Sequence, residues 1–103
     1  MDGQASISTD ILARYAADAA REVAGVRGLT ESPIPIPGRR GGVRVSGEES
    51  GTRVEIHLAV DWGASIPELG RAVQQRVREY LKQMADVEAA TVDVVVEEIG
   101  PRP

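Results

Sequence analysis

The chain of 103 residues contains no cysteine. This absence excludes disulfides, thiolate metal sites and cysteine nucleophiles. Histidine occurs once, at His57, and a lone histidine with a neighbouring carboxylate supplies too few ligands for a metal site. No serine lies in a G-x-S-x-G motif, and only His57 could serve as its base. We therefore expect a non-enzymatic protein without a catalytic, metal or cofactor site.

Long apolar runs are also missing. No stretch approaches the roughly 20 apolar residues of a membrane span, and the start MDGQASIS lacks the basic and apolar regions of a secretory signal. The net charge of −4 and the pI near 5.0 provide no general attraction to phosphate backbones or anionic lipids. We expect a cytoplasmic protein that neither binds nucleic acid nor inserts directly into a membrane.

Two segments have helical periodicity, and the length suits one domain. Residues 8–24 have an alanine-rich apolar stripe, with Ser8 or Thr9 as the N-cap and Gly25 closing the carboxyl end. After Gly63, the pair Ser65 and Glu68 predicts a capping box. The second helical stripe consists of Ile66, Leu69, Val73, Val77, Tyr80, Leu81 and Met84.

Three segments alternate with the period of a strand: a short one through Val43 and Val45, one over 53–62, and one over 91–99. The turn formers at 47–51 make the first two an antiparallel hairpin. The order helix, strand, strand, helix, strand predicts an α+β fold. We expect a two-layer α/β sandwich, in which two helices cover one face of a small three-stranded sheet; the strand order stays open.

The other face of that sheet would carry mixed side chains, which suit either a wet surface or a partner surface. They are Arg44, Arg53, Glu55, His57, Asp61, Asp93 and Glu97, together with the apolar Ala59, Val95 and Ile99. We interpret His57 and Asp61, four residues apart in one strand, as solvated. Glu97 and Glu98 are expected to be exposed.

The segment 29–42 is expected to be a loop, because Pro33, Pro35 and Pro37 lack amide donors. Ile34 and Ile36 either tuck against the core or form an interaction segment. Arg39 and Arg40 stand beside two glycines that could cradle an anion, but we interpret both as solvated. The candidate partner surface therefore comprises Ile34, Ile36, Arg39, Arg40, Ala59, Val95 and Ile99.

Several short motifs resemble the alkaline shock protein family, which are bacterial envelope stress response proteins. The motifs are Ile7-Ser8-Thr9-Asp10, Ala19-Ala20, Glu22-Val23-Ala24-Gly25-Val26, Val60-Asp61-Trp62-Gly63, Ser65-Ile66-Pro67, Val73-Gln74 with Val77, Met84, and Val92-Asp93-Val94-Val95-Val96. The resemblance covers about residues 7–99, which we take as a single domain between a flexible N-terminus (1–6) and a flexible tail (100–103). Trp62 stands where the family often has tyrosine and Asp93 where asparagine is common, and the segment 33–37 is unusual.

The resemblance implies a cytoplasmic protein without a known catalytic centre that acts in cell-envelope homeostasis or stress. It implies self-association, or recruitment to the inner face of the membrane by a small membrane-anchored protein. A protein recruited in this way needs no membrane span of its own.

Two other functions stay open. Gly25-Val26-Arg27-Gly28 spells the G-x-x-G of nucleic-acid-binding KH domains, although the loop after it cannot begin the helix that a KH domain requires. The run of strand, helix and strand over 52–99 suits a ferredoxin-like regulatory domain, whose metal-transfer version would need the missing cysteines. The remaining version would bind a regulatory small molecule.

Overall fold

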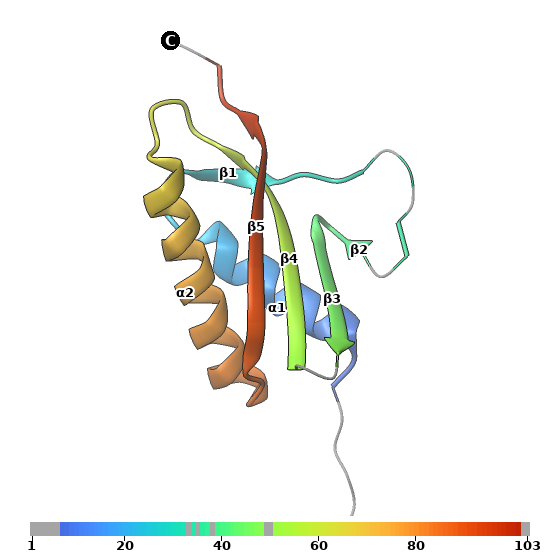
Figure 1. The fold of residues 1–103 in the computed structure, drawn as a ribbon. Helices are drawn as coiled ribbons and strands as arrows, with labels where there is room; N and C mark the ends of the chain where they lie inside the picture. The colour runs from blue at the N-terminus through green and yellow to red at the C-terminus, as the bar shows by residue number, and fades with distance from the viewer. Residues whose placement is uncertain (1–6, 33, 35, 38, 49–50, 102–103) are drawn as a thin grey trace, which may run out of the picture.

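A computed structural model describes residues 7–32, 34, 36–37, 39–48 and 51–101. The segments predicted to be flexible at 1–6 and 102–103, and two loop prolines, Pro33 and Pro35, lie outside the described residues. The elements follow the order α1 (Thr9–Arg21), β1 (Val26–Leu29), β2 (Arg39–Arg40), β3 (Val43–Glu48), β4 (Gly51–Val60), α2 (Ile66–Ala85) and β5 (Ala89–Ile99). Both helices cover one face of a mixed sheet (Figure 1), which confirms the predicted α+β sandwich.

The amino ends of both helices agree with the sequence, but the prediction that Gly25 closes the first helix is wrong, because α1 ends at Arg21 with Glu22 as its C-cap. The Ser8 side chain accepts a hydrogen bond of 3.2 Å from the amide of Ile11, as an N-cap should. Ser65 is the N-cap of α2, but its side chain makes no capping hydrogen bond, so the predicted capping box is not formed. Gly25 has φ +95°, and a Cβ there would lie 2.8 Å from Leu69 Cδ1. This glycine therefore lets α1 and α2 approach closely.

Strand β4 is the centre of the sheet. It pairs in parallel with β5 along one edge, and antiparallel with β3 and β1 along the other. β3 takes the first half of β4, from Gly51 to Ile56, and β1 takes the end, from Leu58 to Val60. β2 adds outside β3. The sheet thus has five strands where three were predicted, because β1 and β2 are too short to show a period of two.

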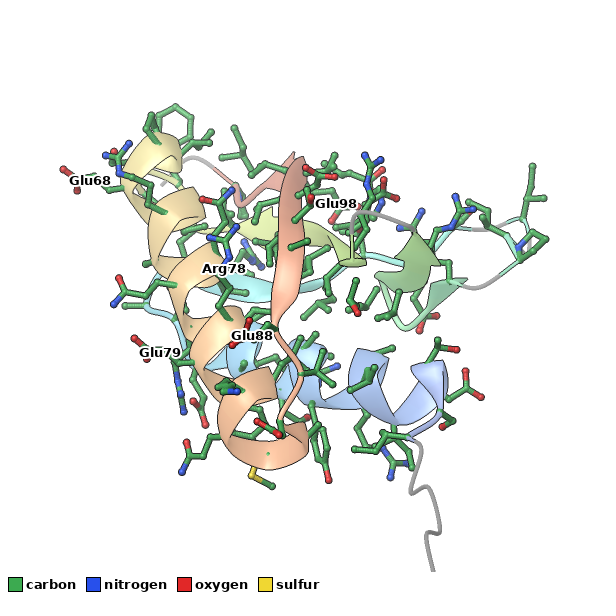
Figure 2. All side chains as sticks on the ribbon, turned by 60° about the horizontal axis from the view of Figure 1, so that its bottom comes forward. Glu68, Arg78, Glu79, Glu88 and Glu98 are labelled. Carbon is green, nitrogen blue, oxygen red and sulfur yellow. The ribbon has the colours of Figure 1, made fainter. Side chains whose placement is uncertain are left out.

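The core lies between this sheet and the helices. The alternation of β4 buries Val54, Ile56, Leu58 and Val60, and α2 contributes Leu69, Val73, Val77 and Leu81. The labelled Glu68 and Glu79 of α2 point away from the sheet (Figure 2). Five buried alanines of α1 allow the helix to lie close to its neighbours: Ala13, Ala16, Ala17, Ala19 and Ala20.

Trp62 was predicted to continue the buried row of β4, and that prediction is wrong. The strand ends at Val60, where the amide of Asp61 donates to Gly25 O at 2.8 Å, and Gly63 turns the chain with φ +87°. Trp62 is consequently 51% exposed. At the two ends of the α2 stripe, Ile66 and Met84 are also exposed. The apolar patterns of β4 and α2 are therefore longer than the stretches that are buried in the core.

No helix in the described part of the chain is long and apolar enough to cross a membrane.

Candidate interaction surface

The sheet face opposite the helices, called the open face below, carries the polar residues of the central strand. Arg53, Glu55 and His57 of β4 alternate with the buried row. The register sets Arg44 of β3 beside Glu55, and Asp93 of β5 beside the same residue on the other edge. Arg53 reaches diagonally to Asp93, with Nη2 2.8 Å from Oδ2. An ion pair therefore joins β4 to β5 on this face, and charged residues of opposite sign stand beside each other on β3 and β4.

His57 lies between two carboxylates. Its Nε2 is 2.9 Å from Glu55 Oε2, and its Nδ1 is 3.0 Å from Glu97 Oε1, although the angle at Nδ1 does not make a hydrogen bond. Only 12% of the His57 side chain is exposed. The expectation that His57 is solvated beside Asp61 is wrong, because β4 ends before Asp61 and the histidine packs under Glu97 of the neighbouring strand.

Glu97 connects β5 to the long segment between β1 and β2. Its Oε1 accepts a hydrogen bond from Thr30 Oγ1 and lies 3.3 Å from Arg39 Nη2. The Thr30 hydroxyl, followed by the nearby charges of His57 and Arg39, lowers the pKa of Glu97 against an opposing desolvation. Glu97 is thus exposed, as expected, but it is also the carboxylate that joins three elements.

Arg39 is not solvated, contrary to the sequence-based interpretation. Its side chain is 9% exposed, its Nη2 donates to Thr30 O at 2.9 Å, and its Nε is buried without a hydrogen bond among the described residues. Arg40 follows in β2, where it pairs with Val43, and its side chain lies outside the described part. Arg39 therefore holds the segment in place and is poorly placed to cradle an external anion.

The apolar candidates on the sheet are separated by a register shift. Val95 pairs with His57 on the open face and is 37% exposed. Beyond it, the pairing slips by one residue, so that Glu98 lies beside Ala59 and Ile99 beside the buried Val60. Ile99, 52% exposed, therefore leaves the alternation that was predicted to group it with Ala59 and Val95. It still borders, with Ala59 and Arg27, a shallow hollow of about 190 Å³.

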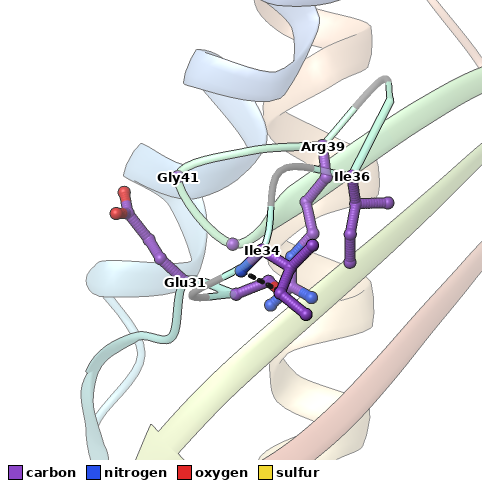
Figure 3. A pocket seen from close by; sticks show the side chains of 7 residues that line it. Glu31, Ile34, Ile36, Arg39 and Gly41 are labelled. Carbon is purple, nitrogen blue, oxygen red and sulfur yellow. Dashed lines mark hydrogen bonds between the residues drawn. The ribbon is translucent and has the colours of Figure 1, made fainter.

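Ile34 and Ile36 do not tuck against the core. They are 70% and 37% exposed, and they border a pocket of about 170 Å³ beside Arg39 and Gly41 (Figure 3). The amide of Ile34 donates to Ser32 Oγ at 3.2 Å. The pocket is smaller than the 300–1,000 Å³ typical of small-molecule sites. The two isoleucines consequently form an exposed apolar projection next to the charged open face.

The structure bears on two features that the sequence raised for other functions and on one contact that the sequence did not reveal. Gly25 to Gly28 leads into β1, which pairs with β4, whereas the KH loop joins two helices. The residues that the structure describes contain no group of three or more histidine, cysteine, aspartate or glutamate side chains that could hold a metal. The long-range contacts of Glu97 and Arg39 were missed because these residues are 58 positions apart and no local pattern links them.

Solved structures share the fold. A doubly substituted MamM-CTD aligns with a TM-score of 0.61 at 18% identity, covering 89% of this chain and 95% of that one. The cadmium form of another MamM-CTD variant aligns with a TM-score of 0.59 at 20% identity, covering 88% and 98%. At such identities the likeness concerns the fold alone.

Sequence comparison identifies the family. The protein Spy1614 of Streptococcus pyogenes serotype M6, described as uncharacterized, is 26% identical over 107 aligned positions, which cover 95% of this chain and 88% of Spy1614. A model of the alkaline shock protein 23 family, described as having a cell envelope-related function, matches residues 1–101. Because that match spans nearly the whole chain, this protein belongs to the alkaline shock protein 23 family, whose function is related to the cell envelope.

Proposed function

We propose that this chain is a non-enzymatic protein-interaction domain that serves cell-envelope homeostasis or stress from the cytoplasm. It acts by binding a second copy of itself or a membrane-anchored protein. The observation that carries the proposal is the uncovered sheet face, where an ordered set of ion pairs adjoins exposed aliphatic side chains at Ile34, Ile36 and Val95.

The chemistry of this surface suits a protein partner. Protein interfaces combine an apolar centre with a polar rim, and they require surfaces that need little ordering on binding. Here Arg39 and His57 are already held by Glu97, so the polar groups beside the aliphatic side chains are fixed before a partner arrives. The small volume of the pocket beside Ile34 and Ile36 and the acidic net charge support a protein over a small molecule or a nucleic acid as the partner of this surface.

Two measurements test the proposal. Light scattering over a concentration series reports self-association, and a pull-down from a native membrane fraction reports a membrane-anchored partner. Ile34→Asp is expected to reduce binding if the projection takes part. Ile66→Asp is the matched control, because Ile66 is an exposed isoleucine on the opposite layer. A protein that stays monomeric at high concentration and recovers no partner contradicts the proposal.

A further inference from the structure

Strand β5 has a strand neighbour on one edge only. It pairs with β4 from Ala89 to Ile99, and none of the described residues forms a strand along its other edge. Figure 1 shows β5 as the last strand of the sheet on the side of α2. An edge strand presents unpaired backbone amides and carbonyls, which are a template for another strand.

The backbone groups that face this edge follow from the neighbouring strands. The amide of His57 donates to Gly42 O, and its carbonyl accepts from the amide of Thr30, so His57 turns away from β5. By alternation, Val54, Ile56 and Leu58 turn toward β5. In a parallel pair the residue opposite such a position turns its backbone outward, which applies to Val92, Val94 and Val96.

A side-chain contact supports that orientation. Gln74 of α2 donates from Nε2 to the carbonyl of Val92 at 3.0 Å. This carbonyl is therefore accessible from the outer edge, and one side chain from the helix fills the place that a strand amide would take. Among the described residues, no side chain donates a hydrogen bond to the carbonyl of Val94 or Val96.

The edge carries none of the usual protections against pairing. From Thr91 to Val96 the register with β4 is unbroken, and the segment contains no proline, lysine or arginine. Five of these six residues are β-branched, which favours an extended strand. Natural edge strands are commonly blocked by such charges, prolines or bulges. On β5 the two register shifts lie outside this segment, at Ala90 and at Glu97.

Two of the three acidic side chains of β5 have partners within the chain. Asp93 pairs with Arg53 at 2.8 Å, and Glu97 contacts Arg39 and His57. Two acidic strands would ordinarily repel each other when placed side by side. These internal contacts therefore weaken the repulsion between two copies of β5.

We propose that the outer edge of β5 binds β5 of a second copy, antiparallel and centred on Val94. This inference rests on the proposed function and names the surface for its self-association. In this register Val94 lies opposite its own copy, Val92 opposite Val96, and Asp93 opposite Val95, so no two carboxylates face each other. The three pairs of outward-facing valines form about six backbone hydrogen bonds, and an amide of the second copy replaces Gln74 at the Val92 carbonyl.

Amide hydrogen exchange of the full chain tests the edge directly, over a concentration range in which light scattering follows association. The amides of Val94 and Val96 are expected to exchange fast in the monomer and slowly in the dimer. The amides of Asp93 and Val95, which face β4, serve as internal controls and are protected at every concentration. Association that leaves Val94 and Val96 unprotected overturns the inference but not the proposed function.

A pair of substitutions at one exposed position tests the register. Val95→Glu sets a carboxylate opposite Asp93 of the second copy at two symmetric places, and we expect dimer affinity to fall about tenfold. Val95→Lys sets an ammonium group there, and affinity is expected to hold or rise. Thermal denaturation checks that both variants fold. Equal losses in both variants overturn the proposed register.

The two proposals fail in different ways. Absence of self-association in the parent chain overturns the β5 inference, while recovery of a membrane-anchored partner would still support the proposed function. Absence of both overturns both. Gln74→Ala is expected to raise the dimer affinity, because it removes the side-chain amide that competes for the Val92 carbonyl. A glutamine with a purely structural role would leave the dimer affinity unchanged.

Discussion

The two faces of the sheet differ in how far apart in the sequence their contacting residues lie. The covered face is apolar, and its residues, such as Val54 and Ile56, and those of the helix that packs on it, such as Val77, belong to periodic patterns within single elements. The open face is charged, and its contacts join residues as far apart as Thr30 and Glu97. The covered face therefore carries the stability of the domain, whereas the open face positions its loop and its polar surface. Substitutions on each face should differ in size and in kind.

The largest effect is expected on the covered face. Val77→Asp would place a carboxylate in the middle of α2, where Val77 is fully buried and no described cation lies in the core. Burying an unpaired charge should lower the free energy of unfolding by at least about 3 kcal/mol, enough to unfold a small domain. Thermal denaturation followed by circular dichroism measures it. Ile66→Asp on the same helix is the control, and a parent-like melting temperature for Val77→Asp would contradict the assigned core.

An intermediate effect is expected where the long segment meets the sheet. Gly42 has φ +83°, and a Cβ there would lie 2.7 Å from Thr30 O. Gly42→Ala should therefore destabilise the domain by roughly 1–3 kcal/mol through backbone strain and the close approach. Gly63→Ala is matched, since Gly63 has φ +87° and open space around it. Chemical denaturation should show a larger decrease in the free energy of unfolding for Gly42→Ala than for Gly63→Ala. Equal decreases would mean that backbone strain alone, without the close approach to Thr30 O, causes the effect.

A smaller and more local effect is expected from the centre of the open face. Glu97→Gln removes the charge that contacts Arg39 and His57. The core is untouched, so the domain should remain folded while the amides of Thr30 and Arg39 exchange faster with solvent. Hydrogen exchange read residue by residue measures this. Unchanged protection at both amides would show that Glu97 does not hold the segment.

The same carboxylate predicts a pH dependence. The pKa of Glu97 is lower in the folded chain than its ordinary value of 4.5, because the ionised form accepts a hydrogen bond from the Thr30 hydroxyl and lies beside His57 and Arg39. Its contribution to stability is therefore complete above that ordinary value and is lost as the pH falls through the lowered pKa. The difference in melting temperature between the parent and Glu97→Gln should shrink below about pH 4.5. A difference independent of pH would contradict this sign.

The smallest effect is expected far from both faces, at the exposed end of α2. Lys82 pairs with Asp86 at 2.7 Å, and the pairing raises the pKa of Lys82 and lowers that of Asp86. Both side chains are more than half exposed, so water and salt screen the pair. Lys82→Ala should leave the melting temperature unchanged within measurement error. A clear decrease in the melting temperature would mean that this exposed ion pair stabilises the domain about as much as the contacts of Glu97 do.

Local patterns in the sequence determined the two helices, the three longer strands, the buried row of β4 and the cap at Ser8. These features depend on residues within one turn or one strand, where hydrophobic period and cap chemistry act without the rest of the chain. The family resemblance was also carried by motifs inside those elements, and the match over residues 1–101 confirms it.

The alternation of the strands predicted most residues of the open face, but tertiary structure alone decided their contacts. β1 and β2 are strands only because β4 and β3 offer them hydrogen-bonding edges. Arg39 and His57 are held by Glu97, which is 58 and 40 positions away, and the bulge after Val96 separates Ile99 from Ala59. The open edge of β5 likewise became visible only when its parallel partner was known. Such contacts depend on which strands become neighbours, and the alternation within a single strand does not determine its neighbours.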